Sequence, residues 1–142
     1  MITEVDSAVI DFTGICGEGG GTAVYFRAIE LDGSVTYSQT FPKGLLPHCK
    51  GRCWSVVVVD SERERLIANP LNRHLLSSLS MLEPNPDGSL TLIYGPKRPR
   101  DKYVSNWLPT DFGRTFNITH RFYAPTEDVS LGDYFPPPLI RQ

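Results

Sequence analysis

Residues 116–123 read Phe-Asn-Ile-Thr-His-Arg-Phe-Tyr, an alternation of apolar and polar side chains. Side chains along a β-strand point alternately to the two faces of its sheet. One face of this segment therefore carries Phe116, Ile118, His120 and Phe122. The pattern predicts a strand with that face in an apolar core, where His120 is the ionisable group of the row.

Other segments of the chain carry strand patterns as well. Residues 53–60 form a run rich in β-branched side chains, which predicts a central strand that is apolar on both faces. Residues 90–94 alternate after an Asp-Gly turn, and residues 71–80 are the one segment that predicts a helix. The sequence as a whole predicts a mainly β fold, an antiparallel β-sandwich or jelly roll with one or two short helices.

A hairpin is predicted where residues 22–31 and 34–41 flank Asp32-Gly33. Asp-Gly is a favoured two-residue type I′ loop, because both of its positions need positive φ. In the register that this turn sets, Phe26 lies opposite Gln39 on an apolar face. A buried Gln needs hydrogen-bond partners, so Gln39 either bonds within the sheet or faces a pocket.

Length and charge limit the function classes. The chain has 142 residues and a net charge of −2, which predicts one domain over residues 1–142 and disfavours a nucleic-acid groove. The first residues lack the pattern of a signal peptide, and no long apolar segment follows them. We therefore expect a cytoplasmic protein with no membrane contact and with reduced thiols at its three cysteines.

No metal or cofactor is predicted. His48, Cys49 and Cys53 offer three soft ligands, but a structural zinc site wants four, and Cys16 stands alone. Residues 17–21 are glycine-rich, yet a strand pattern follows where a phosphate-binding loop needs a helix.

Seven short motifs follow one another in a fixed order. They are FPKGLLP (residues 41–47), WSV (54–56), NPLNR (69–73), DGSLTL (87–92), SNWLP (105–109), RFYAP (121–125) and PPPLIR (136–141). This order and spacing resembles the domain-of-unknown-function family 1214, which usually forms the carboxy-terminal half of larger two-domain proteins. The resemblance implies a jelly-roll-like antiparallel sandwich and carries almost no information on function.

The resemblance also marks polar positions. Those that match the family are Asn69, Asn72, Arg73, Asn106 and Trp107. We interpret them as groups that brace loops, with a role in a site as the alternative. Two histidines depart from the family pattern: His74 replaces a more usual aromatic residue, and His120 replaces an aliphatic one.

Two functional hypotheses of different classes remain. The first is a cofactor-independent enzyme in which His120 moves a proton on a small organic molecule held inside the sandwich, for isomerisation, cyclisation or hydrolysis. Its candidate lining groups are Tyr25, Tyr37, Gln39, Trp54 and Tyr94. The second is a non-catalytic small-molecule-binding or protein-interaction module, in which His120 is a hydrogen-bonded core residue. Self-association is left open under both hypotheses.

Overall fold

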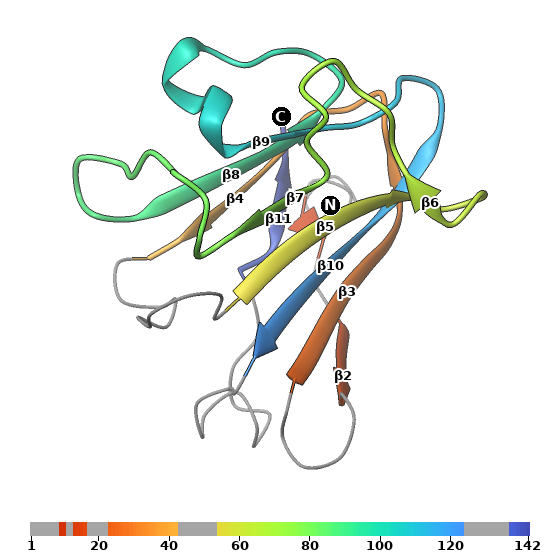
Figure 1. Cartoon of the computed structure of the whole chain (residues 1–142), viewed down its shortest axis with the longest axis horizontal. Helices are drawn as coiled ribbons and strands as arrows, with labels where there is room; N and C mark the ends of the chain where they lie inside the picture. The colour runs from red at the N-terminus through yellow and green to blue at the C-terminus, as the bar shows by residue number, and fades with distance from the viewer. Residues whose placement is uncertain (1–8, 11–12, 17–22, 43–53, 124–136) are drawn as a thin grey trace, which may run out of the picture.

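Two β-sheets, here called sheet A and sheet B, make up the fold (Figure 1). The computed structural model describes residues 9–10, 13–16, 23–42, 54–123 and 137–142. Within these ranges sheet A has the strand order β1 (Val9–Ile10), β11 (Leu139–Arg141), β4 (Tyr37–Phe41), β8 (Leu90–Gly95), β9 (Trp107–Pro109). Sheet B has the order β2 (Thr13–Cys16), β3 (Ala23–Asp32), β10 (Thr115–Tyr123), β5 (Trp54–Asp60), β6 (Arg65–Leu66), and β7 (Leu75–Ser77) also pairs with β5. Every described pairing is antiparallel except β8 with β9. The predicted mainly β sandwich is therefore confirmed.

Strand β10 is a central strand of sheet B. It lies between β3 and β5, and its inward row, Phe116, Ile118, His120 and Phe122, is at most 1% exposed. The inward row predicted for this segment is confirmed. Strand β5 is also central, since β10 pairs with one of its edges and β6 and β7 share the other.

The predicted hairpin is wrong. Strand β3 belongs to sheet B and β4 to sheet A, so Phe26 and Gln39 are buried on different sheets instead of paired in one. Positive φ is found among the described glycines at Gly88 and Gly113, and Gly33 does not share it. The segment after Asp32 is a crossover between the sheets, because β4 pairs with β8 and β11 in sheet A instead of with β3.

A β-bulge in β3 sets which side chains reach the core. Glu30 has φ 53°, and the register with β10 shifts between Phe116 and Ile118. The Asn117 Oδ1 atom accepts the Glu30 N–H at 2.8 Å. The bulge lets Ala28 and Leu31, three residues apart, both point inward.

The helix predicted over residues 71–80 is also wrong. Residues 75–77 form β7, which pairs with β5 from Ser55 to Val57. An open strand edge supplies hydrogen bonds that outweigh the helical preference of this short segment. Within the described ranges the structure has one helix, the 3₁₀ helix η1 (Asp101–Asn106), and no helix there is long and apolar enough to cross a membrane.

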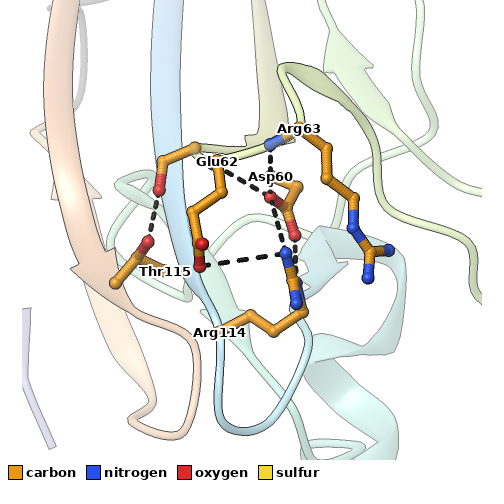
Figure 2. A network of polar contacts seen from close by, with 6 residues as sticks. Asp60, Glu62, Arg63, Arg114 and Thr115 are labelled. Carbon is orange, nitrogen blue, oxygen red and sulfur yellow. Dashed lines mark hydrogen bonds and ion pairs between the residues drawn. The ribbon is translucent and has the colours of Figure 1, made fainter.

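The last residue of β5, Asp60, has a buried carboxylate that lies in a network of polar contacts (Figure 2). The Asp60 Oδ1 atom accepts the backbone N–H groups of Glu62 and Arg63 at 3.0 and 2.9 Å, and Oδ2 accepts the Arg114 Nε–H. The side chain of Asp60 is 4% exposed, while that of Arg114 is 29% exposed. The hydrogen bond from Arg114, then those from the backbone, hold the pKa of Asp60 well below its usual range. This network ties the β5–β6 turn to the start of β10.

We expect Asp60→Asn to lower the free energy of unfolding at neutral pH by about 2–3 kcal/mol, because the half-buried Arg114 loses its charged acceptor. Since the folded-state pKa of Asp60 is depressed, its contribution is present above the unfolded-state pKa of about 4 and is lost as pH falls below it. The stability difference between the two proteins should therefore shrink in acid. Denaturant unfolding at several pH values measures it.

The matched control is Asp101→Asn, which breaks the exposed Arg98–Asp101 ion pair (62% and 91% exposed side chains) and should cost under about 0.5 kcal/mol. Equal losses from the two variants would contradict the role given to Asp60.

Candidate functional site

Three polar side chains meet in the interior between the sheets. The Gln39 Oε1 atom lies 2.7 Å from the Tyr94 hydroxyl and 2.9 Å from His120 Nε2. Gln39 comes from β4, Tyr94 from β8 and His120 from β10, and each is fully buried. This group, here called the interior triad, links the two sheets through hydrogen bonds.

The carbonyl of Pro137 fixes the orientation of the triad. A carbonyl oxygen only accepts, so the Gln39 atom 2.9 Å from it is the donor Nε2, and Oε1 faces the other way. That oxygen also only accepts, so Tyr94 donates its hydroxyl proton and His120 donates from Nε2. His120 therefore carries its proton on Nε2, as the neutral tautomer.

Aromatic rings surround the His120 imidazole. Phe41 from sheet A packs edge-on to it with ring centres 5.5 Å apart, and Phe122 stacks on it at 6.2 Å. Burial in these surroundings lowers the pKa of His120 to about 3 and raises that of Tyr94 above its usual value. Both groups are thus held in their neutral forms at ordinary pH.

The other candidate lining residues do not join the interior triad. Tyr37 is buried, packs against Phe116 and accepts the Asp32 N–H at 3.1 Å. Trp54 is buried at the start of β5. Tyr25 lies in β3, and its side chain is outside what the structure describes.

Asn69 and Arg73 brace the loop before β7. The Asn69 amide accepts the Leu71 and Arg73 N–H groups and donates to the Ile67 and Arg73 carbonyls, at 2.8–3.1 Å. The Arg73 Nη1 atom donates to the Val104 and Trp107 carbonyls of η1 and β9. The two residues therefore close their own loop and fasten it to sheet A.

Asn106 and Trp107 fasten the segment beside β8. Asn106 is fully buried, and its amide bonds both backbone groups of Glu83 and the Thr91 carbonyl at 2.8–2.9 Å. The Trp107 indole N–H donates to the Gly95 carbonyl at 2.9 Å. These four hydrogen bonds all join a side chain to backbone, as expected of a structural brace.

Asn72 and His74 lie in the same loop, where His74 is half-buried. Asn72 is exposed with φ 50°, and its Oδ1 is 3.2 Å from His74 Nε2. Among the described residues, no three His, Cys, Asp or Glu side chains are grouped as metal ligands would be. The positions of His48, Cys49 and Cys53 are outside the described residues, as is the side chain of Cys16.

A feature that sequence reasoning missed lies on the outer face of sheet B. Five apolar side chains there, here called the outer stripe, are Ile29, Val57, Val59, Leu66 and Leu75, and the polar Asn117 and Thr119 of β10 lie between Ile29 and the other four. Leu66 lies opposite Val59 and Leu75 opposite Val57, so these pairs share one face. Ile29 is 58% exposed and Leu66 52%. The unbroken apolar run of β5 was a signal for it, since an alternating strand would place polar residues at positions 57 and 59.

Comparison with known proteins gives a family and a fold. A family model described as "Protein of unknown function (DUF1214)" matches residues 26–127. No curated protein matches the sequence. The VPA0106 protein from Vibrio parahaemolyticus is similar in structure, with a TM-score of 0.73 and 23% identity over 89% of this chain and 32% of its own. A putative uncharacterized protein from Burkholderia cenocepacia is similar with a TM-score of 0.66 and 20% identity over 93% of this chain and 34% of its own. This chain thus spans about a third of the length of either protein, and the likeness concerns the fold alone.

Proposed function

This chain belongs to the DUF1214 family, whose function is unknown, and on that premise we propose that it is a non-catalytic protein-interaction module. The observation that carries the proposal is the closed interior triad. His120 is fully buried, and its Nε2 proton is engaged by Gln39. The histidine that a catalytic function would need therefore serves to join the two sheets.

The chemistry of His120 favours the same conclusion. A general base works best when its pKa is near the operating pH, and the pKa of this imidazole is lowered to about 3. At neutral pH its protonated form is populated in only about one molecule in ten thousand. The acid/base enzyme acting on a small organic molecule stays a prediction, and it would require the triad to open for a ligand to reach the ring.

The outer stripe supplies the binding surface. Four of its members, Val57, Val59, Leu66 and Leu75, lie on the paired strands β5, β6 and β7, where branched side chains can pack closely against a second apolar surface. An apolar patch on a sheet face is a usual mark of a protein–protein contact. A cytoplasmic location, suggested by the sequence, is part of this proposal.

Site-specific photo-crosslinking in cells that make the chain tests the proposal. With a photoreactive amino acid at position 66, we expect a covalent protein adduct that is lost when Ile29→Lys is added to the same chain. The matched control is position 40, because Thr40 is exposed on β4 of sheet A. The proposal is contradicted if position 66 gives no adduct, or only the adducts that position 40 gives.

A further inference from the structure

We propose that the surface that covers the outer stripe is a second copy of this chain, related to the first by a twofold axis. The inference rests on the proposed function and names the partner at the same surface. In a twofold contact the same patch is used by both copies, so the patch must be complementary to itself. The outer stripe and the charges beside it meet this condition.

The apolar part of the patch suits a sheet-on-sheet contact. The outer stripe extends from Leu66 on β6, across β5, to Ile29 on β3; the strand between them, β10, places Asn117 and Thr119 on this face, opposite Val59 and Val57, so the stripe has one apolar part on β5, β6 and β7 and a second at Ile29. Three strand spacings make this about 14 Å, which is wide enough for the aligned face-to-face packing of two sheets. Two such stripes would cover each other's most exposed members, Ile29 and Leu66.

The charges beside Ile29 are of opposite sign. Arg27 and Glu30 are both exposed on β3, one on either side of Ile29. With Ile29 near a twofold axis, Arg27 would face the partner's Glu30, and Glu30 would face the partner's Arg27. A patch of one charge sign would repel a copy of itself, whereas this arrangement forms two opposite-charge pairs. Arg121 adds one more positive charge farther along the same face of β10.

Sedimentation velocity of the purified chain over a range of concentrations tests the inference. We expect reversible dimerisation, and we expect Ile29→Lys with Leu66→Lys to abolish it while the far-ultraviolet circular dichroism stays that of the parent. Thr40→Lys, on β4 of sheet A, is the matched control and should leave the dimer unchanged. A parent chain that stays monomeric at every concentration overturns the inference.

Charge reversal tests the twofold arrangement itself. Arg27→Glu alone and Glu30→Arg alone should each raise the dissociation constant of the dimer by about tenfold or more. The double variant, with both charges exchanged, should return it to within about threefold of the parent value, because the two pairs re-form. A double variant as weak as either single variant overturns the arrangement. If the chain is monomeric but position 66 still gives an adduct with a different protein, the second copy is not the partner, and the proposed function is retained. If the chain is monomeric and gives no adduct, both the further inference and the proposed function are overturned.

Discussion

Gly33→Ala is expected to destabilise the fold by about 3 kcal/mol or more, because this turn has no room for a methyl group. A Cβ atom built on Gly33 would lie 2.2 Å from the Asp111 carbonyl oxygen and 2.5 Å from that of Arg114. Both obstacles are backbone, so no side-chain rotation can relieve them. The Gly33 N–H also donates to the Arg114 carbonyl at 2.8 Å, and its carbonyl accepts the Thr110 hydroxyl at 2.9 Å. The crossover between the sheets is thus fastened to the loop between β9 and β10.

Gly113→Ala is the matched control for Gly33→Ala. Gly113 has φ +83°, and a Cβ there would have no atom within 4 Å. That variant should cost only the ordinary penalty of left-handed backbone, about 1 kcal/mol. The denaturant midpoints of the two variants distinguish the cost of a steric clash at Gly33 from the cost of backbone strain at Gly113. A loss at Gly33 no larger than that at Gly113 would contradict the packing described for the crossover.

His120→Leu is expected to make the protein less sensitive to acid. The folded protein holds His120 neutral with a pKa of about 3, while the unfolded chain has the ordinary value near 6.5. Because the folded-state pKa is lowered, the unfolded state binds more protons between these values. The stability due to the neutral imidazole is complete above pH 6.5 and is lost as pH falls toward 3. The largest possible loss over this window is on the order of 5 kcal/mol.

The leucine variant removes this proton linkage. At neutral pH it should lie within about 1–2 kcal/mol of the parent, because Gln39 Oε1 keeps its bond from Tyr94 and an apolar side chain suits the ring-lined site. At about pH 4.5 the variant should gain roughly 2–3 kcal/mol relative to the parent. Urea unfolding at the two pH values measures the change, and both values lie above the range in which the contribution of Asp60 is lost.

Tyr94→Phe serves as the control for His120→Leu. It removes the other bond to the same Gln39 oxygen and leaves the imidazole in place, so it should keep the acid sensitivity of the parent. A leucine variant with the parent's pH slope would show that His120 is not the linked group.

Hydrophobic periodicity correctly predicted the strands in which each side chain is apolar or polar according to the face on which it lies. The inward row of β10, the central place of β5 and the strand after Asp87-Gly88 all follow from alternation or from β-branched runs. These signals are local, since each side chain responds to the face on which it lies. The predicted need of Gln39 for buried partners was met by Tyr94 and Pro137, together with His120.

The predictions were wrong where the structure of a segment depends on strands that are far away in the sequence. Asp32-Gly33 has the composition of a hairpin turn, but the turn does not determine which sheet receives the next strand. The bulge at Glu30 and the pairing of β7 with β5 likewise depend on neighbours far along the sequence. The interior triad combines β4, β8 and β10, and their relative register follows from the whole sandwich. The sequence therefore identified Gln39, Tyr94 and His120 as separate candidate site residues but could not predict that they are in contact.

The protonation of His120 is the most direct test of the claim that the interior triad is structural. Correlation of the imidazole ¹⁵N and ¹H resonances gives the tautomer and charge, and the signal missing from His120→Leu assigns the residue. The structure predicts a proton on Nε2, an unprotonated Nδ1, and resonances that do not change from neutral pH down to about 4.5. A titration near the ordinary histidine value of about 6.5, or a proton on Nδ1 in place of Nε2, would contradict it.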